Sequence, residues 1–157
     1  MTGITGANLT QTYTSIEDGN TPSVGTIVCS QNKKYKFVQY EAGAVAAAGV
    51  AGEVAYYYAP SGASAGSTTV VTSDLSDSAG LGAGVLQADT ADGEYCWIQI
   101  KGPATLSIAL TAGADGNALT AVGAGDGTLD VSAAVTDAVV AYAVDASAKI
   151  IMCDFPE

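Results

Sequence analysis

Histidine and arginine are both absent from this 157-residue chain, and charged residues of every kind are scarce. Histidine is the usual general base and the commonest metal ligand, so catalytic arrangements of the Ser-His-Asp or Cys-His type are excluded. Arginine supplies the planar fork that clamps phosphates and carboxylates, and the chain has no such clamp. Charged residues make up 13% of the chain, about half the usual share, which favours a surface partly covered by partners.

Positive charge is the second shortage. Lysine is the only basic residue, with 5 copies against 16 acidic residues, and the formal net charge is −11. Nucleic-acid binding needs clustered positive charge, and we interpret the cluster of Lys33, Lys34 and Lys36 as the guard of an edge strand instead. We therefore expect no nucleic-acid partner. We also expect no membrane partner, because an anionic lipid surface would repel the chain and the longest apolar run, residues 42–52, is too short to span a bilayer.

Cysteine is rare as well, and its odd count of 3 argues against a disulfide framework. Cys29, Cys96 and Cys153 show no metal-site or redox spacing. Cys96 and Cys153 lie in apolar runs, where we expect buried, reduced thiols that act as small hydrophobic side chains. Reduced thiols agree with assembly in a cytoplasm, and residues 1–5 show no signal-peptide pattern. We expect neither a metal nor a cofactor.

Carboxylates are the one catalytic residue type that the chain holds in number. The pairs Asp74/Asp77 and Asp92/Glu94 could act as glycosidase acids, but no sequence feature separates their pKa values as that chemistry requires. Residues 89–94 and 126–130 resemble calcium loops only in part. We interpret all of these carboxylates as turn residues and expect that the chain is not an enzyme.

Residues 82–104 form the stretch around which the chain is organised. Asp92 and Gly93 suit the centre of a type I′ turn between two strands. After this turn, Tyr95, Trp97 and Gln99 alternate with apolar residues, which is the period of a strand with Trp97 at its middle. We expect residues 102–103, Gly-Pro, to end that strand and a second alternating strand to follow over residues 105–110.

The rest of the chain shows short apolar runs between turn signals, the spacing of a sandwich or barrel. Further strand candidates are residues 26–29, 35–40, 53–58, 68–72, 118–122, 128–132, 138–144 and 149–155. Residues 73–84 are interpreted as a loop, and residues 43–52 leave helix, strand and loop open because alanine favours a helix and glycine opposes it.

The predicted fold is all-β: a small β-sandwich or barrel, jelly-roll-like, with Gly/Ala-rich loops. Residues 1–26 are polar and threonine-rich, so we expect an extended N-terminal arm or lead-in, followed by a single β domain over residues 27–157. The side chains expected to be mostly buried are Trp97, Ile98, Ile100, Leu106, Ile108, Val140 and Ile150.

The stretch around Trp97 also carries a family resemblance. Residues 84–86 and 92–104, the Gly-rich segment 112–116 and the runs 139–144 and 150–152 resemble the small decoration, or cement, proteins of tailed bacteriophage heads. The resemblance covers roughly Lys34 to the C-terminus. It implies a compact β domain, usually trimeric, that sits on the outer surface of the virion head after assembly in the host cytoplasm. Its partners would be the major capsid protein, whose subunits it bridges, and further copies of itself.

Two sets of residues are candidates for these contacts. An extended arm can add a strand to a neighbour's sheet edge, so we expect capsid contacts from the apolar arm residues Ile4, Leu9, Tyr13 and Ile16. The other interpretation of the arm, a frayed terminus or an extra strand of its own domain, stays open. The successive Tyr56, Tyr57 and Tyr58 are candidates for an oligomer or partner surface, although alternate tyrosines of a strand face opposite ways.

Two other functions remain open at this point. One is a virion adhesin, a head- or tail-fibre component that binds host surface glycan through the three tyrosines. The other is a small acidic glycan-processing enzyme. Binding of the free protein to undecorated capsids, as opposed to host surface material, distinguishes the first hypothesis from the adhesin.

Overall fold

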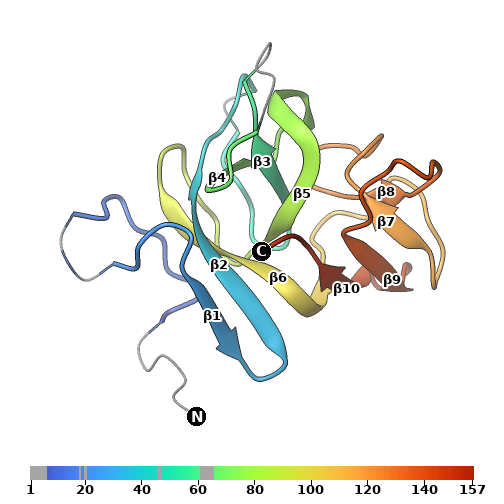
Figure 1. Cartoon of the computed structure of the whole chain (residues 1–157), viewed down its shortest axis with the longest axis horizontal. Coiled ribbons are helices and arrows are strands. Elements are labelled where there is room, and N and C mark those ends of the chain that lie inside the picture. Colours follow the sequence, from blue (N-terminus) through green and yellow to red (C-terminus); the bar gives the residue numbers. More distant parts are fainter. Residues whose placement is uncertain (1–6, 18, 20, 46, 61–65) are drawn as a thin grey trace.

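Strands form nearly all of the regular structure in the computed structural model, which describes residues 7–17, 19, 21–45, 47–60 and 66–157 (Figure 1). One short 3-10 helix, η1, separates two of them. The elements are β1 (Ile27–Ser30), β2 (Lys33–Tyr40), β3 (Val54–Tyr58), β4 (Val70–Thr72), η1 (Leu75–Asp77), β5 (Ser78–Leu86), β6 (Tyr95–Thr105), β7 (Ala118–Thr120), β8 (Asp130–Val131), β9 (Ala141–Asp145) and β10 (Ile150–Asp154). The all-β prediction is confirmed.

The pairing of the strands closes a barrel. β2 pairs with β4 in parallel, and antiparallel pairings then run from β4 to β3, from β3 to β5 and from β5 to β6. β6 pairs in turn with β2, which completes the ring. Closure leaves these strands without a free edge along the paired stretches. Of the two architectures expected from the sequence, the ring corresponds to the barrel.

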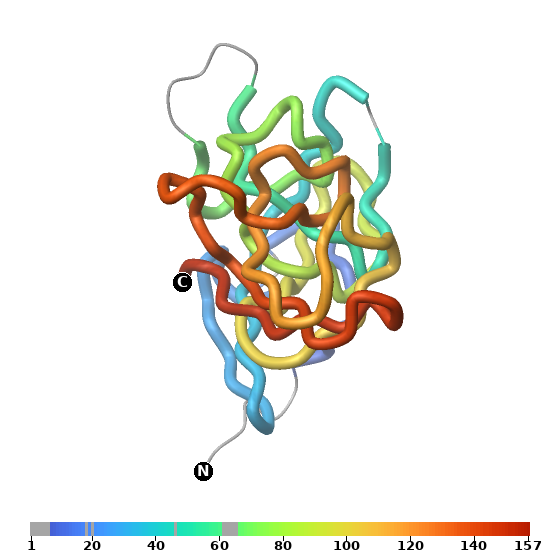
Figure 2. Tube along the Cα trace, turned by 90° about the vertical axis from the view of Figure 1, so that its right-hand side faces the viewer, coloured from blue at the N-terminus to red at the C-terminus, as the bar shows by residue number. Residues whose placement is uncertain are grey.

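A second region, which we call the extension, grows from the far half of β6. Residues 101–105 of β6 pair with β10, and the order continues through β9 and β7 to β8. Figure 2 shows this orange and red part of the chain in front of the barrel. β1 forms a hairpin with β2 that protrudes at the bottom of Figure 1.

β6 separates two hydrophobic clusters, and its predicted alternation is confirmed. Cys96, Ile98 and Ile100 belong to the main core inside the barrel. Trp97 faces the other way, where it packs with Phe37, at 5.1 Å between ring centroids, in a second cluster on the outside of β2 and β6. Each of these side chains is fully buried, so both faces of the strand are covered.

Most of the predicted core is correct, with two exceptions. Trp97, Ile98, Ile100, Leu106 and Val140 are buried. Ile108 is 37% exposed, because residues 106–110 form no strand. Ile150 is partly exposed, because β10 turns Ile151 and Cys153 toward the core instead, next to an irregularity in its pairing with β9. Cys96 and Cys153 are free and buried, as expected.

The turn before β6 lies at residues 92–93 as predicted, but its predicted type and the predicted far end of the strand are wrong. Gly93 has a φ of 77° and Asp92 has a negative φ, so the turn has one left-handed residue, as in type II, where type I′ needs two. Residues 102–103 do not end the strand: β6 continues to Thr105. Pairing of β6 with β2 and β5 ends before Pro103, so one edge of β6 is unpaired at this residue. The N–H that proline lacks therefore costs no hydrogen bond between strands.

The predicted loop 73–84 contains most of β5. Two of its alternate glycines, Gly82 and Gly84, are needed for close packing rather than for turns. A Cβ atom on Gly84 would lie 3.0 Å from Cβ of Ile98, and one on Gly82 would lie 2.8 Å from the Phe155 ring. A strand whose glycines leave room for large neighbouring side chains has the amino-acid composition of a loop. This explains why residues 73–84 were predicted to be a loop. Residues 43–52, left open above, form turns and a single bridge at Gly49, apart from residue 46, which lies outside the described residues.

Candidate partner-binding surface

The acidic pairs of the sequence bind the chain's own backbone. Asp77 accepts the N–H of Ala44 at 2.5 Å, and Asp74 caps η1 by accepting the N–H of Ser76 at 2.9 Å. Burial by itself raises the pKa of Asp74, but these hydrogen bonds outweigh it and hold the pKa below its ordinary value. Asp92 accepts the N–H of Ala42 at 3.0 Å. These carboxylates fix loops by accepting backbone N–H groups, which is the turn role expected of them.

The same use of carboxylates recurs across the molecule. Acidic side chains that accept backbone N–H groups are Glu53, Asp74, Asp77, Asp89, Asp92, Glu94, Asp115, Asp126, Asp130, Asp137 and Asp145. Many of these bonds join loops that are distant in sequence, such as Asp126 to residue 75. Within the described part of the chain, no three acidic or cysteine residues group as a metal site would require.

The three successive tyrosines have three different environments. Tyr56 is fully buried and accepts the N–H of Thr128 at 2.9 Å, so its side chain belongs to the core and not to a partner surface. Burial raises the pKa of Tyr56 far above its ordinary value. Tyr57 is 6% exposed, and its hydroxyl accepts a hydrogen bond from Lys36 at 3.0 Å. Tyr58 is half-buried and is the one that keeps a surface available for a partner.

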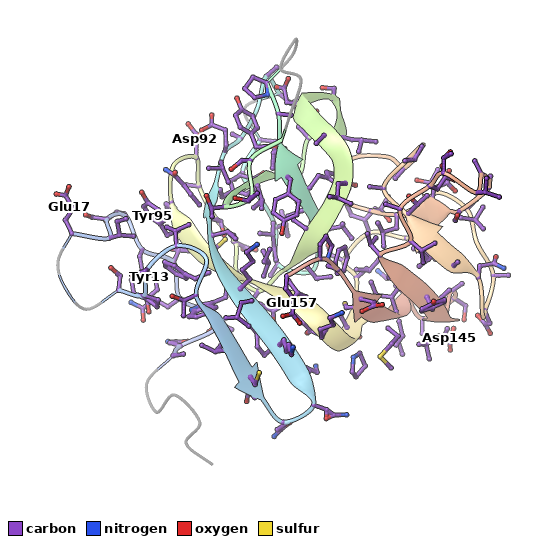
Figure 3. All side chains as sticks on the ribbon, in the orientation of Figure 1. Tyr13, Glu17, Asp92, Tyr95, Asp145 and Glu157 are labelled. Atoms are coloured by element: carbon purple, nitrogen blue, oxygen red, sulfur yellow. The ribbon has the colours of Figure 1, made fainter. Side chains whose placement is uncertain are left out.

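The arm candidates are divided in the same way. Tyr13 exchanges backbone hydrogen bonds with Tyr95 at 2.9 and 2.8 Å, and Figure 3 shows the two side by side. Leu9 and Tyr13 also pack on the cluster of Phe37 and Trp97. Ile16 is 39% exposed, and Ile4 lies outside the described residues. Part of the segment expected to be an arm thus covers its own barrel; its division from the domain at residue 26 and its capsid contacts stay predictions.

The extension presents a different kind of surface, which the sequence prediction did not identify. Pro103 lies opposite Met152, Met152 opposite Tyr142, and Tyr142 opposite Ala118, so one apolar row crosses β6, β10, β9 and β7. Directly opposed residues point to the same side of a sheet. Met152 is 41% and Tyr142 48% exposed, so this side faces outward.

Val144 extends the row, and together these residues form what we call the open face: Ala118, Pro103, Met152, Tyr142 and Val144. Val144 is 50% exposed and lies two residues beyond Tyr142, on the same side of β9. The ion pair between Lys101 and Asp154 borders the row, and Figure 3 places Asp145 on the same extension. An antiparallel strand with one packed face normally carries polar residues on the other. An apolar outer row therefore indicates a surface that a partner covers.

The signal for this face was present in the sequence of β9. Ala141 and Ala143, which are buried, alternate with Tyr142 and Val144, which are exposed. Small residues inside and large ones outside reverse the usual arrangement, and the alternation alone does not say which set faces the core.

No family model, curated protein or solved structure matches the chain. Among the described residues, no helix is long and apolar enough to cross a membrane.

Proposed function

We propose that this chain is a structural virion protein that binds the outer surface of a phage capsid and stabilises it by bridging major capsid subunits. The open face carries this proposal, because it is an apolar sheet surface that no described segment of the chain covers. The resemblance of residues 84–104 to head decoration proteins supports the choice of partner. The carboxylates considered for acid–base chemistry serve the loops instead, which agrees with a function in binding.

The proposed mechanism is thermodynamic linkage. A protein that binds the assembled shell and not its dissociated subunits stabilises the shell in proportion to RT ln(1 + [L]/Kd). At a hundredfold excess over Kd this amounts to about 2.7 kcal/mol per site. No chemical step is required.

A homotrimer is part of the proposal, because three linked copies would engage a three-fold position of the shell together and gain avidity. Tyr58 is the remaining tyrosine candidate for contact between copies, since Tyr56 and Tyr57 are buried. Light scattering on the free and the capsid-bound protein measures the oligomeric state. Monomer in both samples would contradict the trimer without affecting the open face.

The open face is tested by a charge placed on it. Purified protein is added to undecorated capsids, and binding is measured by co-sedimentation, with capsid heat resistance as the second readout. We expect Val144→Lys to weaken binding at least tenfold, because it buries an unpaired ammonium in an apolar contact. Val135→Lys is the matched control, because it adds the same charge at a residue that is fully exposed in a loop.

The outcomes separate the functions. Equal weakening by both variants would assign the effect to net charge and remove the open face from the mechanism. Absence of capsid binding, together with binding of the native protein to host surface material, would replace the decoration function by that of an adhesin.

A further inference from the structure

Lys36 is a charged residue placed on the core side of a barrel strand. It shares its side of β2 with the buried Val38 and Tyr40, and it is itself 5% exposed. Its ammonium donates to the hydroxyl of Tyr57 at 3.0 Å and lies 5.1 Å from the centre of that ring. The Tyr57 hydroxyl is oriented for this contact, because its own proton is directed to the Pro156 carbonyl, at 3.5 Å.

No carboxylate balances this lysine within the described part of the chain. The ion pairs found there join Lys34 to Glu157 at 2.5 Å and Lys101 to Asp154. The single phenol oxygen of Tyr57 satisfies one N–H of the Lys36 ammonium and leaves the others without an acceptor among the described residues. Buried charges in proteins are normally paired, so this arrangement is unusual for a purely structural residue.

Lys36 lines a cavity of about 250 Å³ together with Tyr57, the C-terminal residues Pro156 and Glu157, and residues 66–68. Tyr57 and Leu81 contribute apolar wall, and Ser67 and Thr68 contribute hydroxyl groups. The Ser67 oxygen already accepts the N–H groups of residues 69 and 70, at 3.1 and 2.9 Å, so its own O–H is free to donate to a ligand. A cavity of this size is below the range for drug-sized ligands, and suits a single sugar ring.

We propose that this cavity binds the carboxylate of an acidic monosaccharide, of the uronic acid class. The Lys36 ammonium is the counter-ion of the carboxylate, the Ser67 hydroxyl is a second donor, and the Tyr57 ring is the wall on which the sugar ring packs. A single ammonium in a chain of net charge −11 matches a monoanion better than the doubly charged phosphate. The site does not depend on capsid binding.

Glu157 is a second charged residue that lines the cavity, and its charge affects the binding of an anionic ligand. It lines the same cavity, and Figure 3 shows it beside β2 and β10. Its carboxylate is paired with Lys34, so it leaves Lys36 unbalanced, but it still repels an incoming anion. Glu157→Gln is therefore expected to tighten binding of the ligand several-fold.

The test is a titration of the full chain followed by amide NMR shifts, with glucuronate as the probe and glucose, acetate and inorganic phosphate at equal concentration. We expect saturable shifts at residues 36, 57 and 67 with glucuronate alone. Lys36→Met should weaken glucuronate binding at least tenfold, whereas Lys149→Met, which removes a lysine elsewhere on the surface, should leave it unchanged. If Lys36→Met fails to fold, Ser67→Ala replaces it, with the same direction expected.

Each remaining result overturns the proposal or part of it. Glucuronate binding of equal strength in the Lys36 and Lys149 variants would remove Lys36 as counter-ion. Equal binding of glucose would show that the site does not recognise the carboxylate. Equal binding of acetate would show that it does not recognise the sugar ring. Stronger binding of phosphate would replace the ligand class. None of these results bears on capsid binding, which is measured separately.

Discussion

The barrel and the extension cover their sheet surfaces in different ways. In the barrel, β3 is buried at successive positions and the middle of β6 is buried on both faces. In the extension, β9 and β10 alternate between buried and exposed positions along their length. Both regions carry apolar side chains on both faces, so the difference lies in what covers the outer one.

The outer cover of the barrel comes from the chain itself. Residues 7–13 lie over the cluster of Phe37 and Trp97, and Tyr13 pairs with Tyr95 at the edge of that cluster. No described segment lies over Met152 and Tyr142 in the same way. An apolar outer face of the sheet is therefore covered either by the chain itself, as in the barrel, or by a partner, as we propose for the extension.

The largest effect is expected in the cluster outside the barrel. Trp97→Ala should lower the free energy of unfolding by about 3–5 kcal/mol, because a fully buried indole leaves a cavity. Met152→Ala on the open face should change it by less than about 0.5 kcal/mol. Urea denaturation measures both.

Trp97→Phe is the control for the first variant. It keeps an aromatic ring and removes an indole N–H that has no partner among the described residues, so it should cost much less than alanine. Equal losses for Trp97→Ala and Met152→Ala would contradict the division between a covered and an open face.

The second effect concerns the cover itself. A variant that starts at Gly25 should lose about 2–3 kcal/mol of stability, because the half-buried Leu9 and Tyr13 no longer shield the cluster. Capsid affinity of the folded fraction should be unchanged if the open face makes the contact. Unchanged thermal stability combined with weaker capsid binding would instead restore the arm as the capsid-binding element.

A third comparison uses tyrosine hydroxyls in the two regions. Tyr56→Phe should cost about 1–3 kcal/mol, because it leaves the buried N–H of Thr128 without its acceptor. Tyr142→Phe should be close to neutral, because Tyr142 is 48% exposed on the open face. Thermal unfolding of both variants is sufficient, and the reverse order would show that the hydroxyl of Tyr142 has a structural partner.

Below pH 9.0, the smallest expected effect is the dependence of stability on pH. Burial raises the pKa of Cys96 to about 11 and that of Cys153 to about 12, from an ordinary value of 9.0. A pKa raised on folding gives stability that is present below pH 9.0 and is lost as pH rises through the folded values. Thiol labelling at pH 8 should accordingly modify the exposed Cys29 quickly and the other two only on unfolding. Fast labelling of all three would show that the core opens locally.

Prediction from sequence succeeded where one strand carried large side chains on both faces. Trp97 and Ile98 are both fully buried, and their alternation was enough to place them on opposite sides of β6. The prediction failed in β5, where a strand consists largely of small residues. The glycines of β5 lack side chains because Ile98 and Phe155 occupy that space, and this is visible only once the neighbours are known.

The candidate surface was predictable only in part, for a related reason. Tyr56, Tyr57 and Tyr58 were correctly placed in a strand, but two of them are enclosed by elements far away in the sequence, such as the turn that contains Thr128. The open face depends on pairings between different strands, and the most distant of them joins Pro103 to Met152. Periodicity within one strand carries no information about such partners.

The position of Phe155 has a consequence for how the protein folds during synthesis. The last strand of the ring ends at Thr105, so all of its strands have left the ribosome long before Phe155 has. Phe155 is nevertheless fully buried in the main core, over Gly82, and donates its backbone N–H to Ile100. Domains tend to fold as units once their core is available, so the barrel is expected to stay loosely packed until residue 155 has emerged. Folding of the barrel is then delayed until residue 155 has emerged, by which point the residues of the open face have also been made.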